Sequence, residues 1–146
     1  MAMLLVPLPL LAGTLTSLLC RVPSGAGSTI AFRPPAVVFS IVWPTLFLLM
    51  GTAWYLSRAD SIIVHVGNSL LLFSMMAWLV VYACRGKKTQ ALYVLLSSVL
   101  FAVGVLCLYP APRNLLVVPL VVWLLFATLM NAMEVQHLSH GGKVAS

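Results

Sequence analysis

Apolar residues run along this chain in five long blocks that are separated by short polar breaks. A helix needs about 20 apolar residues to cross the hydrocarbon core of a bilayer. The pattern therefore predicts five transmembrane helices, at about residues 3–20, 36–57, 61–84, 90–108 and 115–136, followed by a polar tail at 137–146. The first block has no basic segment ahead of it, so we expect a retained helix and no signal peptide.

Composition points the same way. The chain has 146 residues, of which 62% are hydrophobic and only 7% are charged, whereas soluble domains carry about 25% charged residues. We therefore expect a single all-α domain covering 1–146, a multi-pass membrane bundle of five transmembrane helices in contact with membrane lipids.

The net charge of +6 raises the question of nucleic-acid binding. The basic residues are scattered through short loops and form no stripe, so we expect no nucleic-acid partner. Five spans place two basic loop residues on one side and six on the other: Arg58 and Arg113 against Arg21, Arg33, Arg85, Lys87, Lys88 and Lys143. The positive-inside rule then predicts an N-terminus outside and a cytoplasmic C-terminus.

The three cysteines, Cys20, Cys84 and Cys107, lie in or at the ends of apolar blocks, and none belongs to a C-x-x-C pair. Free cysteine behaves as a small buried hydrophobic residue. Because the count is odd and the spacing wide, we expect neither a disulfide framework nor a metal site.

Ionisable residues are missing from the middle of the spans. Glu134 lies near one end of the fifth span, where an interfacial carboxylate is expected, and His65 lies one turn into the third. A small proton-coupled exporter needs a carboxylate in mid-membrane, so that class is disfavoured. No nucleophile–base set or phosphate-binding loop is visible, which argues against hydrolysis and phosphoryl transfer.

Aromatic residues share one face of the second span. Phe39, Trp43, Phe47, Met50 and Trp54 follow one another at intervals of four, four, three and four, which places them on one side of a helix. Taken alone, this spacing also fits ordinary helix packing, with Trp54 as an anchor at the outer interface. Pro44, within the stripe, is expected to bend the helix beside Trp43 and to free the carbonyl of Ser40.

A matching face occurs in the fifth span, where Trp123, Ala127 and Met130 or Asn131 recur at helical spacing. A small residue beside a large aromatic one leaves room for a flat apolar ligand between the two helices. Asn131 is expected to point inward and bond another helix, or to contact such a ligand.

These two stretches resemble the TspO/MBR family, which includes the tryptophan-rich sensory proteins and translocator proteins. In the fifth span the matching residues are Pro119, Trp123, Phe126, Ala127 and Asn131, and in the second they are Pro34, Pro35, Phe39, Trp43, Leu46, Met50, Gly51, Tyr55 and Leu56. The third span departs from the family pattern, because the run Gln-Leu-x-Leu-Asn-x-x-Trp is missing. The cholesterol motif of animal members is also absent, since no Tyr follows Tyr109.

The resemblance implies a ligand pocket under the first loop. Its expected ligand-binding residues are Ser17, Cys20, Phe39, Ser40, Val42, Trp43, Trp123, Ala127, Met130 and Asn131. The implied ligands are porphyrins and haem-type tetrapyrroles, with no required cofactor and no metal, and the implied roles are reception, sensing, transport or regulation. Homodimerisation is a further expectation from the family.

Two alternatives stay open. One is light-dependent degradation of protoporphyrin, for which Trp43 and Trp123 are the candidate catalytic residues by resemblance. This route would need no acid–base residues. The other is a divergent membrane scaffold without a working pocket.

Overall fold

The computed structural model describes residues 2–21 and 34–141, and these residues form helices and short connections. The elements, in chain order, are η1 (Ala2–Leu5), α1 (Leu8–Leu19), α2 (Ala36–Leu56), α3 (Ile62–Leu79), η2 (Val80–Cys84), α4 (Lys88–Leu108), η3 (Arg113–Leu116) and α5 (Val118–Gly141). The all-α prediction is confirmed, and the second, third and fourth predicted spans agree with α2, α3 plus η2, and α4.

The first predicted span, 3–20, is wrong as a continuous helix. The structure breaks it into the 3₁₀ turn η1 and the 12-residue helix α1. The reason is that Pro7 and Pro9 have no backbone N–H to donate to a preceding turn, so the helix starts afresh around them. At 1.5 Å per residue α1 is only about 18 Å long, and four helices, those containing α2 to α5, are long and apolar enough to span a membrane.

The fifth helix extends beyond its predicted end at residue 136, because α5 continues as a helix to Gly141. Apolar periodicity ends near residue 136, but helical hydrogen bonding needs only compatible residues. The chain from 120 to 140 contains neither proline nor glycine, and glycine, a poor helix former, occurs only at the end. Residues 142–146 of the predicted tail lie outside the described part of the chain.

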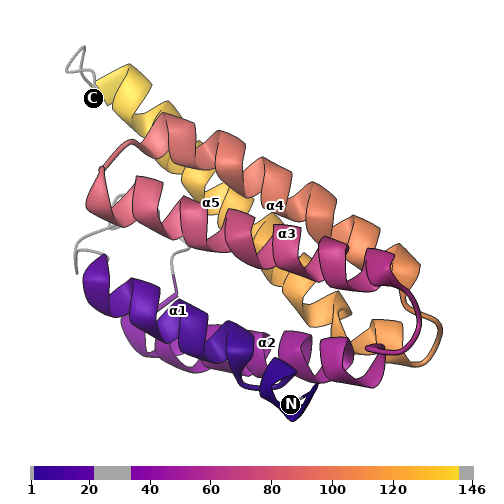
Figure 1. Ribbon diagram of the computed structural model, residues 1–146. Coiled ribbons are helices and arrows are strands. Elements are labelled where there is room, and N and C mark those ends of the chain that lie inside the picture. The colour runs from indigo at the N-terminus through magenta and orange to yellow at the C-terminus, as the bar shows by residue number, and fades with distance from the viewer. Residues whose placement is uncertain (1, 22–33, 142–146) are drawn as a thin grey trace.

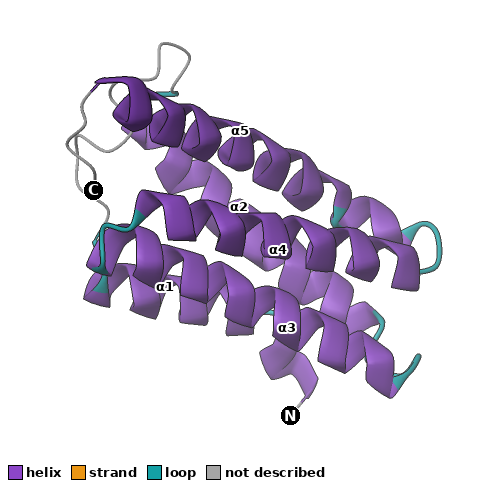
Figure 2. Cartoon of the chain, turned by 90° about the horizontal axis from the view of Figure 1, so that it is seen from above, coloured by secondary structure: helices purple, strands orange, loops and turns teal. Residues whose placement is uncertain are grey.

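The helices surround a common core, with α4 packed between α3 and α5 while α1 packs on α2 and α3. One end of the bundle holds the end of α1, the start of α2, the η2–α4 connection and the end of α5 (Figure 1). The other end holds η1, the α2–α3 turn and the α4–η3 connection (Figure 2). The helix connections therefore lie at two opposite ends of the bundle, in the same two groups that were used above to count basic residues on each side of the membrane.

Close packing of α1 and η1 on α2 depends on two glycines. A Cβ on Gly51 would collide with the backbone oxygens of Leu5 and Val6, and a Cβ on Gly13 would collide with the ring of Phe47. Only a residue without a side chain allows these approaches. The core proper lies between the helices, and its fully buried members include Met50, Leu71, Leu95, Leu120 and Leu124.

The α2–α3 turn is tied to η3 by one arginine. Arg113 pairs with Asp60 at 3.1 Å, and its Nη1 donates to the Leu56 carbonyl at 2.7 Å and to the buried hydroxyl of Ser57 at 3.1 Å. Three contacts from one guanidinium fix this end of the bundle.

Large apolar side chains cover the outside of the bundle. They include Leu19, Phe73 and Leu100, each about three-quarters exposed (75%, 74% and 74%). Such a surface would be unstable in water but suits lipid. With the four spanning helices, it identifies an integral membrane protein.

Candidate functional site

A cluster of seven aromatic side chains lies where α2, α3 and α5 converge. We call it the aromatic cluster, and its members are Phe39, Trp43, Phe47, Trp78, Tyr82, Trp123 and Phe126. Three come from α2, one from α3, one from η2 and two from α5. The cluster therefore joins helices that are far apart in the sequence.

Ring contacts run through the cluster without a gap. Trp43 lies at its centre, 6.1 Å from both Trp78 and Trp123 between ring centroids. The contact with Trp78 is stacked and that with Trp123 is edge-on, and Phe39 also meets Trp123 edge-on at 5.6 Å. Stacked and edge-on geometries are the favourable ones for aromatic pairs. The aromatic stripe of α2 thus faces inward, as its spacing predicts.

The indole N–H of Trp123 stands out within this cluster. Its Nε1 atom is buried and has no hydrogen-bond partner among the described residues. A buried donor without a partner is costly, so indole N–H groups inside proteins usually find an acceptor. Trp123 thus contributes a buried donor without a partner among the described residues, next to the rings of Phe39 and Trp43.

Two polar rungs connect α3 and η2 to α5 beside the cluster. Trp78 Nε1 donates to Asn131 Oδ1 at 3.2 Å, and the Tyr82 hydroxyl donates to Glu134 Oε2 at 2.7 Å. Both acceptors lie on the same face of α5, one turn apart. The prediction that Asn131 points inward and bonds another helix is confirmed.

The first residue of α4 completes this network. The Lys88 ammonium pairs with Glu134 Oε1 at 3.1 Å and lies 3.6 Å from the centre of the Tyr82 ring. The Lys88 carbonyl accepts a bond from Asn131 Nδ2 at 3.2 Å. Glu134 is only 8% exposed, so it is a buried, fully engaged carboxylate where the sequence suggested an interfacial one.

The predicted ligand-binding residues divide into two groups. Phe39, Trp43 and Trp123 come together in the cluster, while Val42 and Ala127 are partly buried and pack against the hydrophobic core. Met130 is half-buried and Asn131 is buried. Ser17 and Ser40 are exposed, and the Ser17 hydroxyl donates back to the Thr14 carbonyl at 2.9 Å.

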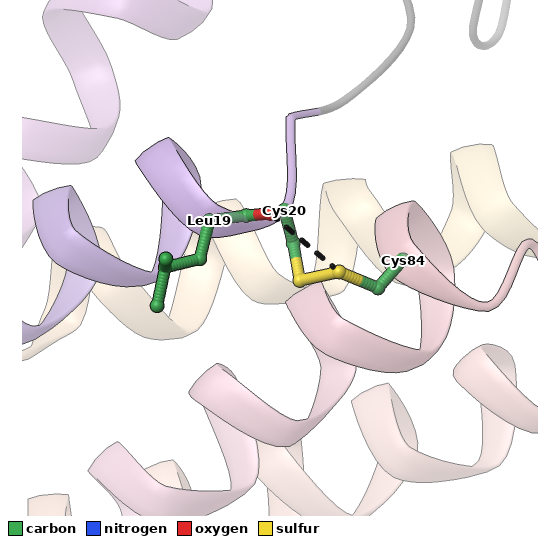
Figure 3. The surroundings of a disulfide bond; sticks show 3 residues. All are labelled: Leu19, Cys20 and Cys84. Atoms are coloured by element: carbon green, nitrogen blue, oxygen red, sulfur yellow. Dashed lines mark hydrogen bonds between the residues drawn. A yellow bond between two sulfur atoms is a disulfide. The ribbon is translucent and has the colours of Figure 1, made fainter.

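The expectation of free cysteines is wrong for two of the three. Cys20 and Cys84 form a disulfide that joins the end of α1 to the end of η2, with their Cα atoms 5.0 Å apart (Figure 3). The two residues are 64 positions apart in the sequence, and only the fold brings them together. Cys20 therefore offers a disulfide sulfur at the predicted pocket, and the free thiol is Cys107.

Trp54 is not the interfacial anchor that its position suggested. It is 4% exposed, and its Nε1 donates to His65 Nδ1 at 2.9 Å. The other ring nitrogen of His65 lies 2.8 Å from the Arg58 carbonyl and so donates to it. Trp54 follows Met50 by four residues on the inward face of α2, which is why it points into the bundle.

Trp78, Tyr82 and Glu134 are the site residues that sequence reasoning missed. Trp78 and Tyr82 are four residues apart, the same spacing that revealed the stripe of α2. Asn131 and Glu134 are three apart on the opposing helix. This spacing marks one face on each helix, but only the fold shows that the two faces meet. In residues 2–21 and 34–141, no group of three metal-ligating side chains comes together.

No curated protein matches the chain. The sequence model of the TspO/MBR family matches residues 5–135, most of the chain, including all the residues of the aromatic cluster. The chain therefore belongs to the TspO/MBR family and is an integral membrane protein of the sensor or transporter type.

Proposed function

We propose that the aromatic cluster binds flat hydrophobic ligands of the porphyrin and haem class between α2 and α5. The observation that carries this proposal is the buried N–H of Trp123, which has no partner in the described part of the chain and lies beside the rings of Phe39 and Trp43. Small-molecule sites are mostly apolar and aromatic, with few polar groups that fix orientation. A tetrapyrrole offers a large flat π-face for the rings and oxygen acceptors for this donor.

Ligand entry must separate rings that now touch. The contacts of Trp123 with Phe39 and Trp43 would be lost, at about 0.5–1.5 kcal/mol each, or about 1–3 kcal/mol together. Stacking and burial of a tetrapyrrole face of comparable or larger area would offset that loss. Asn131 and Glu134 already bond α3, η2 and α4, so they act as supports that keep α5 in place.

A second candidate function is light-dependent oxidation of the bound porphyrin. The favouring observation is that two oxidisable indoles, Trp43 and Trp123, lie in contact at the proposed site. A photoexcited ligand stacked there would touch both.

Binding is tested by quenching of tryptophan fluorescence with protoporphyrin IX, in the dark, on the purified protein in detergent. The test variants are Trp123→Phe, which removes the indole N–H, and Ala127→Phe, which adds a ring to the partly buried position one turn along α5 from Trp123. The matched controls are Trp54→Phe, a tryptophan outside the cluster, and Leu125→Phe, an exposed position of the same helix. We expect saturable binding that both test variants weaken and both controls leave unchanged.

Other results would lead elsewhere. Weak, non-saturable quenching that is equal in all five proteins would refute the proposal and favour a scaffold without a working pocket. Binding that Leu125→Phe weakens as much as Ala127→Phe would place the ligand on the lipid-facing surface.

The photochemical candidate needs a separate test. Illuminated parent protein should consume protoporphyrin, and Trp43→Phe should lose that turnover while it retains binding in the dark. No light-driven turnover by the parent protein would eliminate this function.

We also propose that the C-terminus is cytoplasmic and the N-terminus lies on the opposite side. The support is the excess of basic residues at the end of the bundle that holds the η2–α4 connection. A fluorescent or phosphatase reporter fused after residue 146 should behave as a cytoplasmic fusion. An active exported phosphatase would reverse the assignment.

A further inference from the structure

The Cys20–Cys84 disulfide has an asymmetric environment. Cys20 is 6% exposed, whereas Cys84 is exposed. Each cysteine is followed directly by an exposed arginine, Arg21 or Arg85. Neighbouring cations stabilise a thiolate and favour reaction with anionic thiols. One sulfur can therefore be attacked from outside, while the other is positioned as the leaving group.

Few side chains of the helix that this bond holds are buried in the bundle. Within the described part of α1 and its cap, only Pro9, Gly13 and Cys20 are buried. The apolar side chains of α1 mostly point outward, namely Leu8, Leu11, Leu15, Leu18 and Leu19. Near its end α1 meets α3 through the Thr16 hydroxyl, which lies 3.2 Å from the Met76 sulfur. The disulfide is the covalent attachment of this end of α1.

The partner end of the disulfide leads directly to the aromatic cluster. Cys84 closes η2, a π-helical turn in which the Arg85 N–H donates to the Val80 carbonyl five residues back. The same turn carries Tyr82, which stacks on Trp78 at 5.2 Å, and Trp78 stacks on Trp43. Movement at Cys84 therefore reaches the centre of the cluster through two ring contacts.

We propose that Cys20 and Cys84 form a reversible thiol–disulfide exchange site that reacts with small anionic thiols of the glutathione class and regulates the aromatic cluster. The oxidised form holds the end of α1 against η2, and reduction releases it. The exchange chemistry rests on the disulfide and on the cytoplasmic orientation proposed above. The effect on ligand affinity rests on the function proposed above.

The exchange proceeds in two balanced steps. A thiolate attacks the exposed Cys84 sulfur, forms a mixed disulfide with it and expels the Cys20 thiolate. A second thiolate then attacks the sulfur of the small molecule in that mixed disulfide, which releases the oxidised small disulfide and the Cys84 thiolate. Two electrons pass to the protein disulfide, and each cysteine takes up a proton according to its pKa.

The released Cys84 thiol has an acceptor in place. Its sulfur lies 3.8 Å from the Leu19 carbonyl oxygen (Figure 3). In the disulfide this sulfur has no proton to donate, so the approach is a simple contact. In the reduced form the S–H can donate weakly to that carbonyl only while α1 still lies against η2, so this contact would have to break when the end of α1 is released.

The position of the disulfide in the bundle argues for reversibility. It lies at the end that the proposed orientation places in the cytoplasm. Glutathione and thioredoxin keep cytosolic thiols reduced, and the disulfides that do form there in most organisms are transient and redox-sensing. A permanent structural bond at this place would conflict with that environment.

The first experiment follows the bond and α1 without any ligand. Thiols of the purified protein are alkylated before and after equilibration with reduced glutathione, and amide hydrogen exchange of residues 8–19 is measured in both states. We expect one alkylated cysteine, Cys107, in the oxidised protein and three after reduction. We also expect faster exchange of the α1 amides in the reduced protein, because local opening there becomes easier.

The second experiment measures coupling to the cluster. Dark quenching by protoporphyrin IX is compared between the oxidised and reduced protein, with at least about a fivefold change in Kd expected, the lower range of coupling between sites. The double variant Cys20→Ser/Cys84→Ser should match the reduced protein under both conditions. Cys107→Ser is the control and should respond like the parent.

The outcomes separate the two proposals. The exchange site is refuted if the disulfide resists excess reduced glutathione in the folded protein. It is also refuted if amide hydrogen exchange of α1 is equal in the oxidised and reduced states. Neither outcome depends on ligand binding. Equal Kd values in both states refute the regulation. Failure of protoporphyrin to bind in either state refutes the proposed function. The alkylation and hydrogen-exchange results then still decide whether Cys20 and Cys84 form a thiol–disulfide exchange site.

Discussion

The hydrogen bond from Tyr82 to Glu134 offers a sharp test of how α5 is held. It spans 2.7 Å between η2 and α5, and both residues are buried. Tyr82→Phe removes the hydroxyl and keeps the ring that stacks on Trp78. Glu134→Leu removes the acceptor and leaves Lys88 without its ion pair. The two variants and their combination form a double-mutant cycle.

The expected magnitude follows from the setting. Hydrogen bonds to charged groups contribute about 1.5–3 kcal/mol, but interhelical hydrogen bonds in membrane proteins average about 0.6 and reach about 1.7 kcal/mol. Glu134 is buried and accepts both the ion pair from Lys88 and the hydrogen bond from Tyr82. We therefore expect a coupling energy near the upper membrane value, about 1.5 kcal/mol, or about tenfold in the unfolding equilibrium.

The assay is the free energy of unfolding in mixed micelles titrated with a denaturing detergent. The cost of leaving Lys88 unpaired occurs in both Glu134→Leu arms and cancels in the cycle. Tyr93→Phe is the matched control, since Tyr93 is 65% exposed on α4, and it should change stability by less than about 0.5 kcal/mol.

The reasoning fails if the coupling energy falls below about 0.3 kcal/mol, half the membrane average. It also fails if Tyr82→Phe is no more destabilising than Tyr93→Phe. Either result would mean that α5 is positioned by apolar packing alone and that the polar rungs contribute nothing measurable.

Two further predictions concern packing and pH. Gly51→Ala should lower the free energy of unfolding by about 1–3 kcal/mol through overpacking. Gly104→Ala places a new Cβ in open space and should raise the free energy of unfolding by up to about 1 kcal/mol. Equal effects of the two variants on unfolding in detergent would contradict this reasoning. Burial raises the pKa of Tyr109 from 10.0 to about 12, and the nearby Asn68 side chain and Arg113 offset only part of that rise. Because the folded state holds the Tyr109 proton more tightly than the unfolded state does, the free energy of unfolding is at its full value below pH 10. It falls as the pH rises from 10 to 12, where the unfolded chain loses this proton first. Titration of stability over that window should show the loss in the parent and not in Tyr109→Phe, which should be at least as stable at neutral pH because it removes a buried hydroxyl without a partner.

The sequence was sufficient to predict that the helices exist, but it predicted where they begin and end less accurately. Long apolar blocks predicted α2, α3 and α4 to within a few residues, because lipid leaves an apolar chain of that length few alternatives to a helix. The first span failed at Pro7 and Pro9, where a local backbone effect outweighed the apolar pattern. The fifth helix outran its prediction because helical hydrogen bonding continues through polar residues.

The candidate site was predicted by its spacing on single helices and missed where it depends on pairs. Phe39, Trp43 and Trp123 could be chosen because each lies on a face visible in one span. The Cys20–Cys84 bond and the Trp78–Asn131 rung join residues more than 50 positions apart. No periodicity in one sequence reports such contacts, so they emerged only from the fold.

The third helix departs from the family sequence pattern, but its side chains still contact the face of α5 that carries the family-like residues. The chain lacks the family's third-helix run, yet the family-like residues Trp123 and Asn131 both have partners from other helices. Trp43 meets Trp123, and Trp78 supplies the N–H that Asn131 accepts. Tyr82 then adds a second bond one turn further along, to Glu134. Since the indole of Trp78 is also in stacking contact with Trp43, one residue both supports α5 and shapes the aromatic cluster, and Trp78→Phe should separate these roles by keeping the stack and removing the bond.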